Sequence, residues 1–450
     1  MPSKQGMSLV AIVALVLLWG PATADAGDWT GTRSVASKSR NLTGFSADLG
    51  DNGYAVMAYV VPGESLPGEF EGAVFVKVRR PGERHFRAAI FRGVTRSPFT
   101  DVEIGPGGMT LVTYRGENGL WRVATRWPSG GWLGTQELQG ASSVEAPMVR
   151  IGREGSAAIL GLNSDPATGR SVDVALRDPA SGLFSDWVAV SAPENAVGSF
   201  ASIAPSAFGG WTVVWSSPCS VGDGLGEVRW VELDSSAVTD PYVVRGSGCV
   251  TRGLDLQADR QGNQFLRIGL ADGIQLAARK HDRSFGQAAE VTAAADRTDA
   301  GHLAVSGDGQ ATLIWSRAKP GKPTDAYLYV TARPGGHPAP PRKIRGLRLY
   351  RESANDVLKD AAPLPHGSLA LAFTRSWFTG RRLVKVKVGT AIWKSGTRIE
   401  HPLYTRSGPA GRFVNRIGVE TSFRGSALTW WSTQTELTAR PLGYWWRAKL

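Results

Sequence analysis

One phrase recurs eight times along this chain of 450 residues, at intervals of 47 to 58 residues. Each copy begins with a glycine, followed by a short alternating or apolar run that usually ends in an aromatic residue. The eight glycines are Gly53, Gly108, Gly155, Gly210, Gly262, Gly309, Gly367 and Gly425. A repeat of about 50 residues is typical of the blades of a ring-shaped repeat protein.

The residues around each glycine predict a small antiparallel sheet. In the first copy, residues 45–49 and 54–60 have the two-residue period of strands, and the Asp51-Asn52-Gly53 turn between them suits a tight hairpin. A third strand follows, as at residues 73–79, and an aromatic residue often begins a fourth, as at Trp132. Four antiparallel strands per repeat form a propeller blade.

The chain is therefore predicted to be all-β, a single β-propeller of seven or eight four-stranded blades in residues 27–450. No long segment has a helical apolar period, and the 55 glycines and 26 prolines fall between strands. A lone four-stranded sheet cannot bury both faces, so neighbouring sheets must pack face to face. Two shorter propellers or stacked sandwiches are the alternative. The repeats begin near residues 45, 99, 147, 200, 254, 301, 360 and 416.

The number of blades depends on how the ring closes. Residues 27–36 resemble the fourth strand of a repeat displaced to the start of the chain, and they could pair beside the last repeat. Residues 444–447 could instead give the last repeat a fourth strand of its own. Both arrangements are compatible with the sequence.

Residues 1–26 have the three parts of a signal peptide. Lys4 precedes an apolar run from Leu9 to Trp19, and Ala24-Asp25-Ala26 fits signal peptidase, with cleavage after Ala26. The run is shorter than the roughly 20 residues of a stable membrane span, and no second run of that length follows, although an uncleaved anchor is the alternative. The sequence thus predicts a secreted protein, extracellular or associated with the cell wall.

Two cysteines, Cys219 and Cys249, lie within one repeat. In an oxidising compartment such a pair is expected to form a disulfide, and two buried thiols are the alternative. No cofactor is expected, because the chain has no CxxC spacing and its six histidines are scattered. Irregular calcium sites between blades are still an alternative, because the sequence lacks only the regular twelve-residue calcium loop.

Positive charge is concentrated in the last third of the chain. Residues 317–450 contain 24 Lys and Arg against 7 Asp and Glu, whereas residues 27–316 contain 26 against 31. Two segments, 333–351 and 375–387, are the most basic, and in the second Lys385 and Lys387 alternate with valines. The candidate binding residues are Arg345, Arg348, Arg375, Trp377, Arg381, Arg382, Lys385 and Lys387.

A positive surface attracts polyanions, so the expected partner is an anionic or neutral glycan or a cell-wall polymer. Nucleic acid would bind only through non-specific charge. Solvated lysines that protect a strand edge are the alternative interpretation. Trp377 lies in a turn beside the basic residues and is predicted to be exposed, whereas Trp215, Trp315, Trp430 and Trp431 occupy a repeated position and are predicted to pack between blades.

The repeated phrase resembles that of secreted bacterial propellers of the sialidase-like and Asp-box type. Ser306-Gly307-Asp308-Gly309, running on to Trp315, is the nearest approach to the pattern S-x-D-x-G-x-T-W. The resemblance implies a propeller fold. A sialidase would also need three arginines, a tyrosine paired with a glutamate, and an acid/base aspartate, and the sequence assigns none of these catalytic residues.

Three functions are therefore weighed. The first, which the sequence favours, is a non-catalytic binding protein of the cell surface or extracellular space. The second is a sialidase-like glycoside hydrolase, and the third is a scaffold that docks another exported protein.

Overall fold

A computed structural model gives the fold of the chain. It describes residues 33–34, 43–435 and 442–448, apart from residues 64–69, 82, 84–85, 89, 106, 129, 141–143, 166–168, 192–196, 208, 220–225, 235–236, 293–296, 299–300, 320–321, 348–353, 380–381, 395–398, 400–402, 405–411 and 422–426. The predicted signal peptide, residues 1–26, lies outside the described residues. No helix among the described residues is long and apolar enough to cross a membrane.

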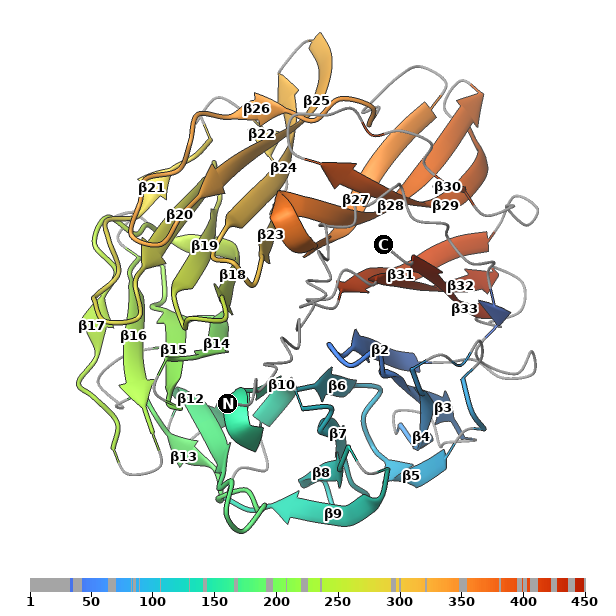
Figure 1. Cartoon of the computed structure of the whole chain (residues 1–450), viewed down its shortest axis with the longest axis vertical. Coiled ribbons are helices and arrows are strands. Elements are labelled where there is room, and N and C mark those ends of the chain that lie inside the picture. The colour runs from blue at the N-terminus through green and yellow to red at the C-terminus, as the bar shows by residue number, and fades with distance from the viewer. Residues whose placement is uncertain are drawn as a thin grey trace, which may run out of the picture.

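The strands in the described residues form eight antiparallel sheets, which stand around a ring as the blades of a propeller (Figure 1). Blade 1 contains β2 (Thr43–Leu49), β3 (Ala55–Pro62), β4 (Gly72–Arg79) and β5 (Ile90–Thr95). Blade 2 contains β6 (Thr100–Ile104), β7 (Thr110–Arg115), β8 (Trp121–Arg126) and β9 (Trp132–Leu138). Blade 3 contains β10 (Val144–Ile151), β11 (Ala157–Asp165), β12 (Gly169–Arg177) and β13 (Val188–Ala189). Blade 4 contains β14 (Ala201–Pro205), β15 (Trp211–Ser216), β16 (Val228–Leu233) and β17 (Tyr242–Val243).

The remaining blades continue this order. Blade 5 contains β18 (Val250–Ala258), β19 (Gln264–Leu270), β20 (Ile274–Arg279) and β21 (Ala289–Glu290). In blade 6 the inner strand is divided, and the sheet contains β22 (Arg297–Thr298), β23 (His302–Val305), β24 (Ala311–Lys319), β25 (Lys322–Ala332) and β26 (Arg342–Lys343). Blade 7 contains β27 (Ala354–Pro363), β28 (Ser368–Thr379), β29 (Arg382–Lys394) and β30 (Leu403–Tyr404). Blade 8 contains β31 (Arg412–Thr421), β32 (Ala427–Thr435), β33 (Leu442–Ala448) and β1 (Arg33–Ser34).

The last blade combines the two ends of the described chain. β1 pairs antiparallel with β33, with Arg33 opposite Trp445 and Ser34 opposite Tyr444. The aromatic segment around Tyr444 is therefore the third strand of blade 8, and the fourth comes from the N-terminal side. One sheet thus links the first described residues to the last, which closes the ring of eight blades.

The hydrophobic core lies between the blades. One cluster joins the valines of blade 1 to Val102, Val112 and Tyr114 of blade 2, and another joins Ala370 of blade 7 to Val419 of blade 8. Leu428 of blade 8 packs into the core of blade 1 and completes the circle. The predicted all-β propeller is confirmed. The described residues contain only two helical turns, both 3₁₀ and of three residues, η1 (Arg153–Gly155) and η2 (Pro365–Gly367).

The glycine of the repeated phrase ends the turn between the first two strands of a blade. Gly262 and Gly309 have φ values of +83° and +85°, a conformation that glycine adopts without strain. A Cβ on Gly262 would also lie 2.5 Å from Cα of Ala207 in the preceding blade. In the fourth repeat the residue with positive φ is Gly209, one position before the glycine expected from the sequence, and Gly425 lies outside the described residues.

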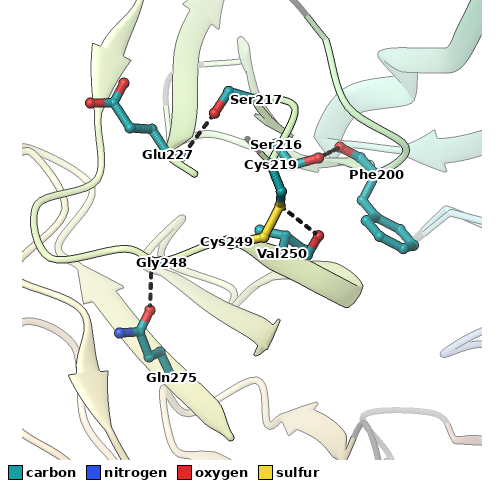
Figure 2. The surroundings of a disulfide bond; sticks show 9 residues. All are labelled: Phe200, Ser216, Ser217, Cys219, Glu227, Gly248, Cys249, Val250 and Gln275. Carbon is teal, nitrogen blue, oxygen red and sulfur yellow. Dashed lines mark hydrogen bonds between the residues drawn. A yellow bond between two sulfur atoms is a disulfide. The ribbon is translucent and has the colours of Figure 1, made fainter. Parts of the chain in front are cut away.

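The predicted disulfide joins Cys219 to Cys249, with 5.5 Å between the two Cα atoms (Figure 2). Cys219 follows β15, and Cys249 immediately precedes β18, so the bond ties a loop of blade 4 to the entry of blade 5. The N–H of Gly248 donates to Oε1 of Gln275 at 3.2 Å, which adds a polar contact with β20. A disulfide accords with the predicted extracellular compartment.

Candidate functional site

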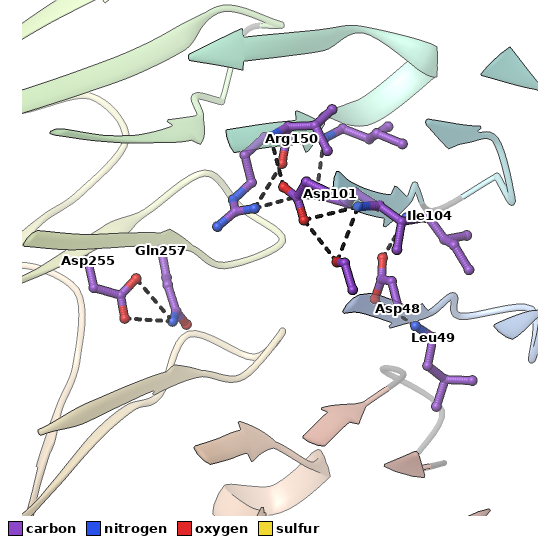
Figure 3. A network of polar contacts seen from close by, with 12 residues as sticks. Asp48, Leu49, Asp101, Ile104, Arg150, Asp255 and Gln257 are labelled. Atoms are coloured by element: carbon purple, nitrogen blue, oxygen red, sulfur yellow. Dashed lines mark hydrogen bonds and ion pairs between the residues drawn. The ribbon is translucent and has the colours of Figure 1, made fainter. Parts of the chain in front are cut away.

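Polar side chains line the inner strands, which surround the axis of the ring. In β6 the residues alternate between buried and half-buried, and the half-buried positions are Asp101 and Glu103. Arg150 of β10, Asp255 of β18 and Asp48 of β2 are half-buried on other inner strands. Figure 3 shows these side chains from different blades turned toward a common central region. We call this set of residues, with Asp360 of β27, the channel network.

Four carboxylates of the channel network, Asp48, Asp101, Glu103 and Asp360, accept hydrogen bonds from the next blade. The N–H of Ile104 donates to Asp48 (Figure 3). The N–H of Ile151 donates to Oε1 of Glu103 at 2.9 Å. The N–H of Val419 donates to Oδ2 of Asp360, also at 2.9 Å. An inner strand is the edge of its sheet, and a buried edge N–H without a partner is costly. These carboxylates therefore satisfy the edge strands and tie successive blades together.

Neutral side chains make the same contact elsewhere in the ring. The N–H of Val305 donates to Oε1 of Gln257 at 3.1 Å, and the N–H of Leu256 donates to Oγ of Ser202 at 3.1 Å. A carboxylate is therefore not required for this contact between blades. Asp48, Glu103 and Asp360 therefore make, with a charged group, a contact that a neutral group also makes.

The charged groups of the channel network perturb one another. Burial raises the pKa of Glu103 to about 7 and that of Asp48 to about 6. Burial also raises the pKa of Asp255 and of Asp360. Arg150 opposes this effect, because its Nη1 lies 3.0 Å from Oε2 of Glu103 in an ion pair. The network therefore contains carboxyl groups that take up protons near neutral pH.

A carboxyl group with a pKa near 7 has the proton affinity of a general acid. In the channel network, however, an oxygen of each such group already accepts a backbone hydrogen bond that holds two blades together. Arg150 belongs to the channel network, and a second arginine, Arg267 of β19, opposes the rise in the pKa of Asp255.

Three predicted binding residues, Arg375, Trp377 and Lys387, share one face of the hairpin formed by β28 and β29. Arg375 lies opposite Lys387, and directly opposed residues in an antiparallel pair point to the same face of the sheet. Nζ of Lys387 lies 5.8 Å from the centroid of the Trp377 ring, a cation–π distance. We call these three residues the basic hairpin. Lys385 lies opposite Trp377 in the register, but its side chain is outside the described residues.

The other predicted binding residues are not joined to the basic hairpin. Arg381 and Arg348 lie outside the described residues, as does the side chain of Arg382, which begins β29. Arg345 is exposed, and its carbonyl oxygen accepts a hydrogen bond from the N–H of Ile399, beyond the far end of β29. Seven residues of strand separate Lys387 from that end, or roughly 23 Å at 3.3 Å per residue. Arg345 therefore belongs to a different part of the surface.

The basic hairpin is held by long strands. β28 and β29 have 12 and 13 residues, whereas β7 and β8, in the same positions of blade 2, have six each. On the opposite face from Lys387, Val388 is buried, as the alternation of valine and lysine predicted. Trp215 and Trp315 are also buried, in agreement with the predicted packing role. The side chains of Trp430 and Trp431 lie outside the described residues.

A series of buried arginines was not singled out from the sequence. Arg79, Arg126, Arg177 and Arg279 each end the third strand of a blade, and each is at most 3% exposed. Three of them lie over an aromatic ring of the preceding blade, at 4.8 to 5.2 Å from its centroid. The signal was present, since four third strands end in arginine. Arg126, Arg177 and Arg279 thus join neighbouring blades.

No group of three or more His, Cys, Asp or Glu in the described part of the chain could hold a metal ion. The channel carboxylates are bound to backbone N–H groups, to Arg150 or, in the case of Asp255, to the amide of Gln257. Irregular calcium sites in the rest of the chain stay a prediction.

The Ser306–Gly309 segment forms the turn between β23 and β24, where Oγ of Ser306 contacts both Asp308 and the carbonyl oxygen of Gln310.

No protein-family model matches the sequence, and no curated protein matches it. Similar solved structures include a lectin from Burkholderia pseudomallei, with 12% identity, a TM-score of 0.47, and coverage of 82% of this chain and 100% of the lectin. An ulvan lyase has 9% identity, a TM-score of 0.47, and coverage of 91% and 95%. A microbial sialidase has 12% identity, a TM-score of 0.38, and coverage of 93% and 95%. The fold assignment itself rests on the strand topology described above.

Proposed function

We propose that this protein is an extracellular propeller that binds an anionic polysaccharide at the basic hairpin. The observation that supports the proposal is the convergence of two cations, Arg375 and Lys387, and the indole of Trp377 on a single face of β28 and β29. The extracellular location follows from the predicted signal peptide and accords with the disulfide between Cys219 and Cys249.

The chemistry of the basic hairpin suits an acidic sugar chain. An indole offers a flat apolar surface for the face of a sugar ring. Guanidinium and ammonium groups bind carboxylate or sulfate through charge-assisted hydrogen bonds. In the register of the sheet, Arg375 lies between Asp356 of β27 and Lys387 of β29.

The charge of the surrounding chain extends the attraction beyond contact. Residues 317–450, which form most of blades 6 to 8, carry a formal net charge of +17. A field of this sign concentrates polyanions near the surface and speeds their association, and it weakens as salt increases. The basic hairpin then supplies the short-range contacts that hold the polymer.

Chromatography on immobilised heparin, an anionic polysaccharide, tests the proposal. Reversal of two charges in R375E/K387E should lower the salt concentration of elution markedly, because both the local contacts and the field are lost. The control K280E/R283E makes the same change of net charge at exposed residues of the turn after β20. It should elute almost as the wild type. Equal shifts for the two variants would show that net charge alone governs retention.

The indole can be tested separately from charge. W377A should weaken heparin binding while the dependence of affinity on salt stays the same, because stacking releases no counterions. Isothermal titration at two salt concentrations measures both quantities. Single-stranded DNA, titrated under the same conditions, distinguishes a polysaccharide site from a general polyanion site. An affinity for DNA equal to that for heparin would contradict the polysaccharide proposal.

A glycoside hydrolase is the second candidate, and one observation favours it: the pKa of Glu103 is raised to about 7. A protonated carboxyl at neutral pH can donate a proton to a departing sugar oxygen. Incubation with a panel of fluorogenic glycosides tests this function. Turnover that disappears in E103Q, with the fold intact by circular dichroism, would support catalysis, whereas turnover that persists would exclude Glu103 from it.

A further inference from the structure

The outer edge of blades 3 and 4 exposes apolar side chains. Val188 of β13 and Tyr242 and Val243 of β17 are 52%, 50% and 44% exposed. Each of these strands is the outermost of its blade and has only two residues. The exposed carboxylates Asp186 and Asp240 precede them by two residues. We call these five residues the acidic rim.

Tyr242 of the acidic rim packs on a buried aromatic ring. Its ring stacks on the buried Trp230, with 4.9 Å between centroids and 29° between planes. Trp230 is in turn held between Phe285, at 5.5 Å, and the guanidinium of Arg279. One face of Tyr242 is therefore fixed, and half of its surface still meets solvent. A preorganised aromatic ring of this kind is typical of the centre of a protein interface.

The acidic rim does not suit the polysaccharide proposed above. Residues 144–249, which span blades 3 and 4, contain 12 Asp and Glu but only six arginines and no lysine. A net charge of −6 repels an anionic polymer. The two carboxylates beside apolar residues suit a partner surface that is cationic and has its own exposed strand edge.

The same chain carries such a surface. β26 is the outermost strand of blade 6, and both of its residues, Arg342 and Lys343, are exposed, as is Arg345 just beyond it. We call these three residues the basic rim. Like β13 and β17, β26 pairs on one side only among the described strands. The partner that the acidic rim requires is thus present on a second copy of the protein.

We propose that the acidic rim of one copy docks against the basic rim of another. The two rims lie at separate places on the ring, as β13, β17 and β26 do in Figure 1. The contact is therefore heterologous, with two different patches meeting. Each copy keeps one free rim of each kind, so that association continues head to tail and forms strings of propellers.

Salt dependence gives the first test. Analytical ultracentrifugation of the full chain should show a mass above one copy that rises with concentration at about 0.01 M salt and returns to one copy near 1 M, where the Debye length falls from roughly 30 to 3 Å. A single copy at every concentration and salt would overturn the proposal. A mass that stops at two copies would overturn the head-to-tail arrangement.

A charge swap separates docking from loss of fold. D186K/D240K has two cationic rims, and R342E/K343E has two acidic rims, so each variant alone should remain a single copy. Mixed together, they should associate again, because each supplies the charge that the other lacks. A mixture that stays dissociated would overturn the proposal. An unfolded variant would fail to show the propeller's circular dichroism and could not be rescued by mixing.

The apolar part of the contact needs its own variant. Y242S keeps every charge of the acidic rim and removes the exposed ring. Association of Y242S at low salt should weaken at least five-fold, the effect of losing an interface anchor worth about 1 kcal/mol or more. An unchanged association constant would mean that the acidic rim is not the docking surface. Heparin retention, which depends on the basic hairpin, is measured on the same variant and should not change.

Discussion

The acidic rim and the basic hairpin occupy the same kind of sheet, yet their surfaces have opposite character. In blades 3 and 4 the outer strands are short and present valine and tyrosine, and an exposed aspartate precedes each of them. In blade 7 the two middle strands reach 12 and 13 residues and present arginine, lysine and tryptophan. The two regions differ in strand length and in the side chains on their surfaces. They do not differ in the way neighbouring blades contact each other.

Inside the ring, the two regions use the same devices. Trp215 of blade 4 and Trp315 of blade 6 occupy the same position of the second strand, and both are at most 1% exposed. Glu103 of blade 2 and Asp360 of blade 7 make the same hydrogen bond with the following blade. The comparison teaches that the repeat fixes the core and leaves each blade free to carry its own surface chemistry.

The largest expected effect tests whether the two cores are equivalent. W215A and W315A each remove a fully buried indole, which should lower the free energy of unfolding by about 3 to 5 kcal/mol. Because both rings fill the same position between blades, the two losses should agree within about 1 kcal/mol. Urea unfolding monitored by circular dichroism measures both. A large loss of stability in only one of the two variants would show that the two cores are not equivalent.

The shared core is also the part of the structure that the sequence predicted best. The spacing of the eight glycines and the two-residue alternation predicted the blades, because both follow from local backbone geometry. Gly210 was predicted where Gly209 has the positive φ, since two adjacent glycines are locally equivalent. The pairing of β1 with β33 depends on a contact between the two ends of the chain, which local patterns cannot decide.

The candidate site was less predictable for a physical reason. Arg375, Trp377, Lys385 and Lys387 were chosen because they lie in one basic segment of the sequence. Trp377 was predicted to be exposed in a turn, and this was wrong: it lies within β28 and is half-buried, with Lys387 beside its ring. Arg345 was grouped with them by charge, although it lies at the other end of β29. The channel network was missed altogether. Its members come from different blades, and single polar residues such as Asp48 and Glu103 stand out only after the strands are arranged around an axis.

The next largest effect concerns a bond that one region has and the other lacks. The disulfide between Cys219 and Cys249 closes a loop with a sequence separation of 30 residues in blade 4, and the cysteines are absent from blades 6 to 8. C219S/C249S should lose about 3 to 4 kcal/mol of stability, by the entropy of loop closure. Thermal unfolding under non-reducing conditions compares the variant with the wild type. W315A should lose the same amount of stability with or without the disulfide, because the sites lie in separate blades.

A smaller effect should appear as pH changes. The pKa of Asp48 is raised from 3.8 to about 6 and that of Glu103 from 4.5 to about 7, so the folded chain holds these protons more tightly than the unfolded chain. Their contribution to stability is therefore complete below about pH 4 and is lost as pH rises through 6 to 7. Because of these two groups, the unfolding temperature of the protein should decrease as pH rises from about 5 to about 8.

Neutral replacement isolates this contribution. Asn in D48N has no charge to desolvate, but its single amide oxygen can accept only one of the two hydrogen bonds that Ile104 and Leu49 donate to Asp48. The stability of D48N relative to the wild type should therefore be higher at pH 8 than near pH 4 by up to about 3 kcal/mol, at 1.36 kcal/mol per unit of pKa. D186N removes an exposed carboxylate from the acidic rim and is the matched control. A parallel shift of D48N at all pH values would contradict the role assigned to burial.

The smallest expected effect sharpens the comparison most directly. If blades carry their surface chemistry independently of the core, then D186K/D240K and K280E/R283E should each leave the free energy of unfolding within about 0.5 kcal/mol per substitution of the wild type, as surface changes usually do. Their association and heparin retention should still differ, because docking depends on the acidic rim and retention on the basic hairpin. Urea unfolding at about 1 M salt, where strings of propellers dissociate, measures stability without the contribution of docking. A loss of several kcal/mol in D186K/D240K would show that the carboxylates of the acidic rim support blades 3 and 4 themselves, and the acidic surface would then be part of how those two blades fold.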